Sequence, residues 1–329
     1  MMRPFTALLF ALTASMVPTN TQANDSSAHL ASGGLEFVRQ KDVVMQSEDL
    51  YLSPDRIDVR YVFRNTSSED ITTLVAFPLP DIEALNDYNN LILPQQDAVN
   101  FIDFTTKVDG RKVEMEIDQR AIALGVDRTA VLREFGVPLE PYLLSTHDAL
   151  AQLAPERQEQ LRKLGLLRRF DGEEPGWLMR TAYYWTQTFP AGQAVVIEHS
   201  YKPVAGRSLS PPLARKGQHD DYSLRAKQDY CISDDQEKAI ASHRLDAAGK
   251  ARFTYFSATV EYILKTGGNW SGPIRNFHLV VEAAKPDDFA LLCLDGAQRV
   301  SRSRLEFSEE NFWPRDNLNV LFIDAVELH

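Results

Sequence analysis

The residues of this chain whose types and spacing suggest chemistry fall into three small groups. The first is the triplet His219, Asp220 and Asp221, which could offer one imidazole and two carboxylates to a metal ion. One contiguous triplet rarely surrounds an ion, and a solvated acidic loop explains the same residues. No other histidine stands three or four positions away on a helix face. We therefore predict no metal site and no cofactor.

The second group is the pair His199 and Tyr201, two positions apart on a predicted strand and so on the same face. Such a pair could act as a general base with a phenolic partner. A half-buried histidine with satisfied hydrogen bonds is the alternative explanation. No nucleophile elbow, glycine-rich phosphate loop or H-E-x-x-H motif accompanies the pair. The catalytic candidates are thus His199, Tyr201, His219, Asp220 and Asp221.

The third group is aromatic, and its candidate binding residues are Trp177, Tyr183 and Trp270. Aromatic side chains on a β-sandwich can stack on sugar rings or form the centre of a protein interface. Tyr183 and Trp185 share one strand face, so part of this set must instead belong to the core. The glycines and proline around Trp270 indicate a tight turn that presents an anchored indole.

The first 23 residues have the layout of a secretory signal peptide. Arg3 precedes a mostly apolar run from Phe5 to Val17, Pro18 ends the run, and small residues stand at Thr21 and Ala23. An uncleaved anchor is the alternative, but this run is shorter than the ~20 residues that a spanning helix needs. We predict cleavage after Ala23, a periplasmic or secreted location, and no integral membrane segment in the mature chain.

Export changes the interpretation of the two cysteines, Cys231 and Cys293. In an oxidising compartment, two cysteines are expected to form a disulfide rather than a catalytic thiol and a spare. A bridge closing so long a loop contributes about 4 kcal/mol in the chain-entropy model.

Composition excludes several classes of protein. The chain has 329 residues, is 44% hydrophobic and carries a formal net charge of −11. These values are ordinary for a globular protein. Nucleic-acid binding is not expected, because it needs a basic patch and the sequence has no basic run.

Alternating apolar residues predict a mainly β fold of the α+β type. Ile57, Val59, Tyr61 and Phe63 alternate with mostly polar residues, and Asp109-Gly110 is a strong hairpin turn. The pattern changes to a helical period within about residues 118–170, with a helix beginning near Asp127 and ending at Gly136. Later strands are predicted at 178–189, 195–201, 253–264, 276–283, 289–294, 299–307 and 318–323.

We expect two β-sandwich-like lobes, of which the first carries this helical insert. The predicted divisions are a signal peptide at 1–23, a first lobe at 24–205 and a second, disulfide-containing lobe at 206–329. The boundary lies in a stretch rich in proline, glycine and charge.

The mature chain contains the segments Asn24-Asp25-Ser26-Ser27, Met45 to Leu50, Arg60 to Thr66 and Asn269-Trp270-Ser271-Gly272-Pro273-Ile274. Together with further phrases, these segments resemble a family of exported bacterial proteins catalogued as domain of unknown function 4424. The resemblance covers almost the whole mature chain, and it implies a Gram-negative exported protein without catalytic residues to transfer. Its most specific phrase is Asn269-Trp270-Ser271-Gly272-Pro273-Ile274. The other matching phrases are Gly33-Gly34-Leu35-Glu36-Phe37, Ala76-Phe77-Pro78-Leu79-Pro80-Asp81, Phe189-Pro190-Ala191-Gly192, His199-Ser200-Tyr201-Lys202-Pro203 and Tyr230-Cys231.

Residues 35–203 are also similar, more distantly, to the VIT-type domains of secreted inter-α-inhibitor heavy chains. That likeness rests on the Phe77-Pro78-Leu79-Pro80 strand end and the hairpin at Val108-Asp109-Gly110-Arg111. It implies a non-enzymatic β-sandwich and says little about partners.

Together these observations favour an exported, non-catalytic binding or envelope-associated protein whose ligand is an unknown protein or glycan. One alternative is a secreted hydrolase whose acids come together from distant strands. Such acids are recognised by their separation in space, which 46 carboxylates in a sequence do not reveal. The other alternative is a secreted effector that acts on host proteins.

Overall fold

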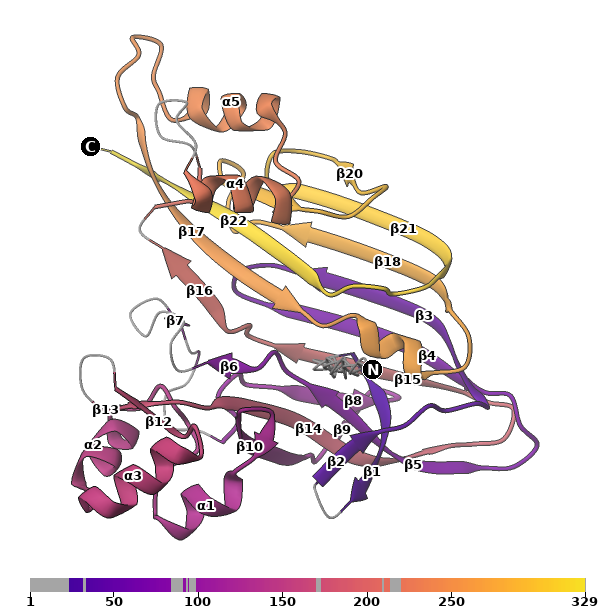
Figure 1. Ribbon diagram of the computed structural model, residues 1–329. Helices are drawn as coiled ribbons and strands as arrows, with labels where there is room; N and C mark the ends of the chain where they lie inside the picture. Colours follow the sequence, from indigo (N-terminus) through magenta and orange to yellow (C-terminus); the bar gives the residue numbers. More distant parts are fainter. Residues whose placement is uncertain are drawn as a thin grey trace, which may run out of the picture.

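The computed structural model describes residues 24–31, 34–83, 91–92, 94, 99–169, 173–208, 210–213 and 220–328. Strands dominate these residues, with a few short helices between them (Figure 1). The mainly β fold predicted from the alternating pattern is therefore confirmed. The expected signal peptide lies outside the described residues.

Three sheets contain nearly all of the described strands, and we call them A, B and C. Sheet A has the order β11 (Val126–Asp127), β10 (Glu116–Ala123), β14 (Leu178–Phe189), β5 (Ile71–Pro78), β1 (Ser26–Ala31) and β2 (Gly34–Phe37), with β6 (Ile82–Glu83) pairing with β14. Sheet B has the order β20 (Gln298–Arg299), β21 (Arg304–Phe312), β18 (Ile274–Glu282), β3 (Val43–Leu52), β4 (Ile57–Asn65), β15 (Ala194–Tyr201), β8 (Thr105–Val108) and β9 (Arg111–Val113). Sheet C has the order β19 (Phe289–Leu292), β22 (Leu318–Glu327), β17 (Phe253–Tyr262), β16 (Ala205–Ser208) and β7 (Leu91–Ile92).

Strand pairing crosses the predicted lobe boundary at 205/206. In sheet B, β18 from the second half of the chain pairs in parallel with β3 from the first half. In sheet C, β16 pairs on one side with β7 and on the other with β17. The two halves of the sequence therefore share sheets, while the lobes as independent units stay a prediction.

One buried cluster contains side chains from all three sheets. The Phe63 ring of sheet B lies edge-on to Phe189 of sheet A, with ring centroids 5.8 Å apart. The Tyr61 hydroxyl of sheet B is 2.9 Å from that of Tyr262 in sheet C. Burial of the alternating side chains Ile57, Val59, Tyr61 and Phe63 on β4, each at most 2% exposed, agrees with their predicted common face.

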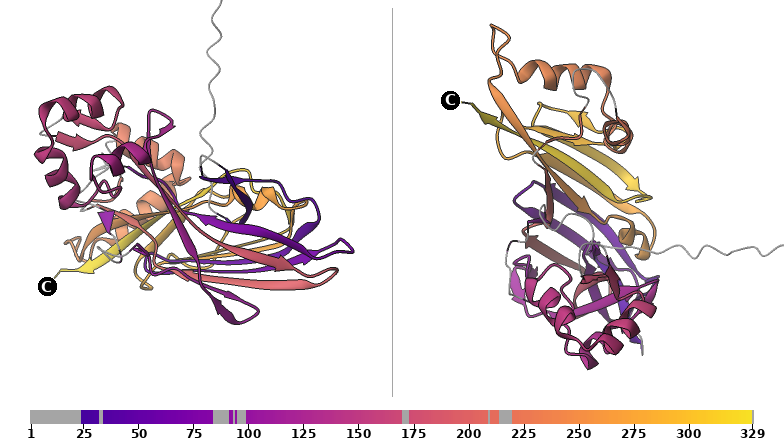
Figure 2. Two further views of the ribbon diagram at one scale, coloured as in Figure 1. Left: turned by 90° about the horizontal axis from the view of Figure 1, so that it is seen from below. Right: turned by 60° about the vertical axis from the view of Figure 1, so that its left-hand side comes forward.

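The helices lie at opposite ends of the molecule (Figures 1 and 2). At one end, α1 (Thr129–Glu134), α2 (Leu144–Gln152) and α3 (Pro155–Lys163) pack together around Trp177, beside the two-stranded β12 (Leu167–Arg169) and β13 (Glu173–Pro175). At the other end, α4 (Asp221–Asp229) and α5 (Asp234–His243) lie over sheet C, where Ile240 contacts its outer face. A 3₁₀ turn, η1, spans Lys265–Asn269.

Two local predictions can be checked in detail. Asp109 and Gly110 both have positive φ angles, 48° and 77°, as the predicted hairpin turn between β8 and β9 requires. Gly136, with φ of 69°, ends α1 in the left-handed conformation, as predicted. The helical insert is narrower than predicted, because residues 116–123 form β10 and pair with β14.

Candidate functional site

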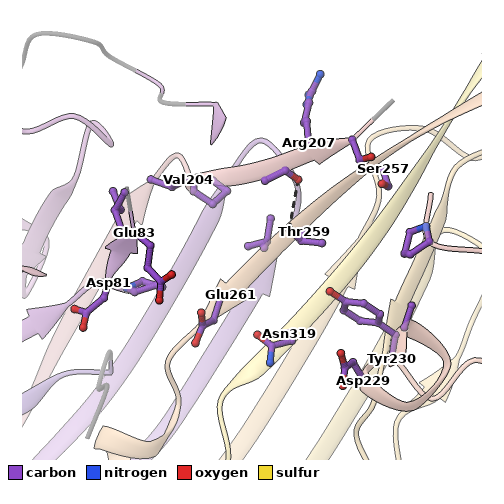
Figure 3. A pocket seen from close by; sticks show the side chains of 18 of the residues that line it. Asp81, Glu83, Val204, Arg207, Asp229, Tyr230, Ser257, Thr259, Glu261 and Asn319 are labelled. Carbon is purple, nitrogen blue, oxygen red and sulfur yellow. Dashed lines mark hydrogen bonds between the residues drawn. The ribbon is translucent and has the colours of Figure 1, made fainter. Parts of the chain in front are cut away.

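A cleft of about 660 Å³ lies beside sheet C (Figure 3). Its volume falls within the range of small-molecule sites. The segment after β5, the strands β16 and β17, and helix α4 form its walls. Its lining includes apolar side chains at Leu79, Ile82, Ile102, Tyr201, Val204 and Val260, and polar ones at Asp81, Glu83, Arg207, Arg225, Asp229, Tyr230, Ser257, Thr259, Glu261 and Asn319.

Three carboxylates, those of Asp81, Glu83 and Glu261, gather at one end of the cleft (Figure 3). Asp81 is already paired: its two oxygens accept hydrogen bonds of 3.1 and 2.7 Å from Nε and Nη2 of Arg180. This bidentate arrangement is the strong form of the carboxylate–guanidinium pair. Asp81 therefore has little remaining capacity for a ligand.

Glu261 differs from Asp81 because no arginine or lysine among the described residues forms an ion pair with it. It accepts one neutral hydrogen bond, of 3.1 Å, from the side-chain amide of Asn317. Burial raises the pKa of Glu261, the Asn317 hydrogen bond lowers it, and the nearby Asp81 carboxylate raises it. Glu261 is itself exposed to solvent, so a cation that enters the cleft can reach this carboxylate and pair with it.

The other end of the cleft is formed by α4 and the residues that follow it. Tyr230, directly before Cys231, is half-buried, and burial raises the pKa of its phenol to about 12. Its hydroxyl therefore remains protonated near neutral pH and can donate a hydrogen bond. Arg207 points away from the carboxylate end (Figure 3). The cleft thus combines an apolar wall, an acidic end and a phenolic end.

A second feature is a buried polar cluster between the sheets, made of Asn24, Asp25, Glu48, His199 and Tyr262. The Asn24 side-chain amide donates to Glu48 Oε2 at 3.0 Å, and the Tyr262 hydroxyl donates to Glu48 Oε1 at 3.3 Å. Nε2 of His199 lies 3.0 Å from Asp25 Oδ1. Asn24, Asp25 and Glu48 are 0% exposed, so a solute does not reach this cluster from outside.

A β-bulge explains why a glutamate faces the core. The register between β3 and β4 shifts between Met45 and Ser47. Val43 and Met45 are buried before the shift, and Glu48 and Leu50 are buried after it. The extra residue reverses the alternation and directs Glu48 inward.

The pKa of Glu48 is raised from 4.5 to about 8, first of all by burial. In a chain that retains residues before Asn24, the folded state therefore keeps a proton that the unfolded state releases between these two values. The stability that Glu48 contributes is complete below pH 4.5 and is lost as the pH rises to about 8.

We expect Glu48→Gln to flatten the pH dependence of unfolding across this window, by roughly 1 kcal/mol per pH unit or less. Urea unfolding at pH 5, 6.5 and 8 measures this pH dependence of the free energy of unfolding. Glu309→Gln, at an exposed glutamate on β21 that does not act on Glu48, is the control and should keep the parent slope. Equal slopes for the parent and Glu48→Gln would contradict the prediction.

The structure places the predicted catalytic pair in the core. His199 is held by Asp25 and by the Thr106 hydroxyl, 2.9 Å from its Nδ1, and it stacks on Phe104. His199 is therefore a buried histidine with a hydrogen-bond partner at each ring nitrogen, which is the alternative explanation given for it above. The pKa of Tyr201 is raised by burial. The two side chains belong to different sites, because Tyr201 lines the cleft and His199 lies in the buried polar cluster.

Asp220 and Asp221 of the acidic triplet stand at the start of helix α4. Asp220 is the N-cap of α4 and accepts a hydrogen bond of 2.8 Å from the Ser223 backbone, while Asp221 stands in the first turn. His219 lies outside the described residues. Within the described ranges, no group of three or more histidine, cysteine or acidic residues could hold a metal ion.

The three predicted binding aromatics are buried: Trp177 and Trp270 are 1% exposed and Tyr183 is 0% exposed. Trp177 donates to the Leu139 carbonyl, and the Tyr183 hydroxyl donates to Asn100 Oδ1. These rings therefore belong to the core and do not form an exposed binding platform.

The sequence analysis did not identify Glu261 as a site residue. In the sequence it is one of many acids, and only its position on β17 places it in the cleft.

Cys231 and Cys293 form a disulfide, as the sequence predicted, with Cα atoms 4.8 Å apart. The bridge connects the turn after α4 to the loop after β19. None of the described helices is long and apolar enough to cross a membrane.

The fold and its cleft thus define a mainly β protein of three shared sheets, with a ligand-sized cavity beside sheet C. The family model described as a domain of unknown function, DUF4424, matches residues 23–321, and the chain belongs to this family.

Solved structures provide only distant likenesses. A "putative nutrient binding protein" from Legionella pneumophila is 18% identical, with a TM-score of 0.46, and the match covers 92% of this chain and 70% of that one. An M1 zinc metallopeptidase from Deinococcus radiodurans is 10% identical, with a TM-score of 0.27, and the match covers 86% of this chain and 43% of that one. No curated protein matches the sequence. Likenesses this distant carry no argument about function.

Proposed function

We propose that this protein is exported, loses residues 1–23, and acts outside the inner membrane as a non-catalytic binding protein for a small solute. The cleft beside sheet C is the proposed binding site. The solute is a compact organic cation, such as an amine with an apolar body. The signal-peptide layout of residues 1–23 supports the export.

The observation that carries the proposal is the environment of Glu261. This carboxylate lines a cavity of about 660 Å³ and accepts a hydrogen bond from a neutral partner, Asn317. Ile82, Val204 and Val260 line the same cavity and provide an apolar surface. An amine bound there would pair its charge with Glu261 and lay its carbon skeleton on that surface.

No specific observation favours a hydrolase or a host-directed effector. Of the acids at one end of the cleft, Asp81 is engaged by Arg180 through both oxygens. It is therefore poorly suited to act as nucleophile or general base.

We expect butylammonium to bind the mature protein more tightly than its neutral counterpart, butanol. Glu261→Gln should weaken the binding of butylammonium by at least about tenfold, because it removes a charge-assisted hydrogen bond. It should change the weaker binding of butanol little. Calorimetric titration at neutral pH measures both ligands.

Glu309→Gln is the matched control, because Glu309 is an exposed glutamate on β21, away from the cleft lining. It should bind butylammonium as the parent does. Equal affinities for butylammonium and butanol, or an equal loss in both glutamate variants, would contradict the proposed site.

A further inference from the structure

The first described residues enter the core of the protein. Asn24, Asp25 and Ser26 are each 0% exposed. The Trp270 indole donates a hydrogen bond of 2.6 Å to the Asp25 carbonyl, and the Asn269 amide donates one of 2.9 Å to Ser26 Oγ. The turn η1 and the residue after it thus hold this segment in place.

The contact between this segment and the turn leaves no room for an additional side chain. A Cβ added to Gly267 would lie 2.8 Å from Nδ2 of Asn24. The same Nδ2 donates to Glu48 and lies within 3.5 Å of the Leu264 carbonyl. The Asn24 side chain is therefore enclosed by Gly267 on one side and by Glu48 and the Leu264 carbonyl on the other.

Two side-chain oxygens of this first segment are buried and have no hydrogen-bond donor. Asn24 Oδ1 and Asp25 Oδ2 accept no hydrogen bond from any described residue. A buried acceptor without a donor destabilises the folded state, because it loses its hydrogen bonds to water and gains none in return. Both belong to the two residues that directly follow the predicted cleavage position at Ala23.

The charges of the cluster are also unbalanced. Asp25 and Glu48 are two buried acids, and the titratable base His199 contacts Asp25. Asn24 and Tyr262 act on Glu48 through hydrogen bonds and Asp25 and Asp49 through their charges, and none of the four is a cation. One further positive charge would compensate the second acid.

We propose that the α-ammonium group created at Asn24 by cleavage after Ala23 is this charge, and that it binds in the buried cluster of Asp25 and Glu48. The group carries three N–H donors. It is attached to the same Cα as the side chain that reaches Glu48, one residue before Asp25. The ligand of this internal site is therefore the protein's own processed terminus.

A functional consequence follows for export. Before cleavage the same nitrogen is a neutral amide, which leaves the acids without a cation. The precursor is then less stable than the mature protein, and removal of the signal peptide completes the fold. This inference rests on the proposed export and is independent of the ligand in the cleft.

The direct test is the reactivity of the terminal amine. Two chains are prepared by removing an N-terminal fusion: one begins at Asn24, and the other begins at Gln22. Each is treated, folded and in denaturant, with pyridine carboxaldehyde, which modifies α-amines, and the product is followed by mass spectrometry. We expect the amine of the Asn24 chain to react about 100-fold more slowly when folded. For the Gln22 chain, the reaction rate of the amine should differ by less than about threefold between the folded and the denatured state.

Glu48→Gln and Glu309→Gln in the Asn24 chain separate the effect of the site from general stability. Glu48→Gln should reduce the protection of the amine by about tenfold, whereas Glu309→Gln, at an exposed glutamate on β21, should keep it. If Glu48→Gln does not fold, the urea unfolding midpoints of the unsubstituted Asn24 and Gln22 chains test the proposal instead. We expect the Asn24 chain to have the higher midpoint.

Equal reactivity of the folded Asn24 and Gln22 chains would overturn the proposal, and so would equal midpoints. Mass spectrometry of the exported protein tests the premise separately, because a terminus other than Asn24 would also overturn it. Loss of butylammonium binding with a protected amine would instead refute only the proposed role of the cleft.

Discussion

Trp270→Ala should lower the free energy of unfolding by about 4 kcal/mol, within the 3–5 kcal/mol range for buried aromatic truncations. Trp270 is 1% exposed, and its ring lies 4.5 Å from that of Phe63 and 5.7 Å from that of Phe189. The substitution also removes the donor to the Asp25 carbonyl. Urea unfolding measures the loss.

Two further tryptophan variants distinguish packing from hydrogen bonding. Trp270→Phe keeps a ring but loses the indole N–H, so we expect a smaller loss of about 1–2 kcal/mol. Trp313→Ala is the matched control, because Trp313 is 51% exposed and its truncation should change stability by less than about 0.5 kcal/mol. Equal effects of Trp270→Ala and Trp313→Ala would contradict the structural role of Trp270.

The double variant Cys231→Ala/Cys293→Ala should lose about 4 kcal/mol of stability, because the bridge closes a loop between residues 62 positions apart. The effect should be local as well as global. Cys231 directly follows the cleft residue Tyr230, and the bridge ties the turn after α4 to sheet C. Denaturant unfolding gives the stability, and hydrogen exchange shows where protection is lost.

We expect α4 and α5 to exchange faster in the disulfide variant, while the strands of sheet B remain protected. Chemical reduction of the parent protein should reproduce the result, which separates the bridge from the side-chain substitutions. A loss below about 1 kcal/mol in both experiments would show that contacts such as that of Ile240 with sheet C are sufficient to hold the helices.

The strands were the most predictable part of the fold, because their signal is local. The alternation at 57–64, the Asp109-Gly110 turn and the segments 178–189 and 195–201 correspond closely to β4, the β8–β9 hairpin, β14 and β15. Helices α4 and α5 were missed. Their sequences are polar, with few residues contacting sheet C, so the apolar stripe that signals a helix is weak.

The site was much less predictable than the fold. His199 and Tyr201 do share a face of β15, yet the face is buried and the imidazole is occupied by Asp25, which is 174 positions away. Glu261 had no distinguishing neighbour in the sequence. Its significance depends on Asp81 and Asn317, which only tertiary contacts bring near it.

The sequence by itself determined the class of this protein: a mainly β chain of the DUF4424 family, with two cysteines suited to a bridge. Those properties follow from periodicity, composition and short phrases, all of which are local. Only the tertiary structure decided which polar groups matter. A one-residue bulge directs Glu48 inward, and pairing between distant strands builds the cleft around Glu261. Burial acts on a charge through its whole surroundings, so neither environment is visible from residue type and spacing.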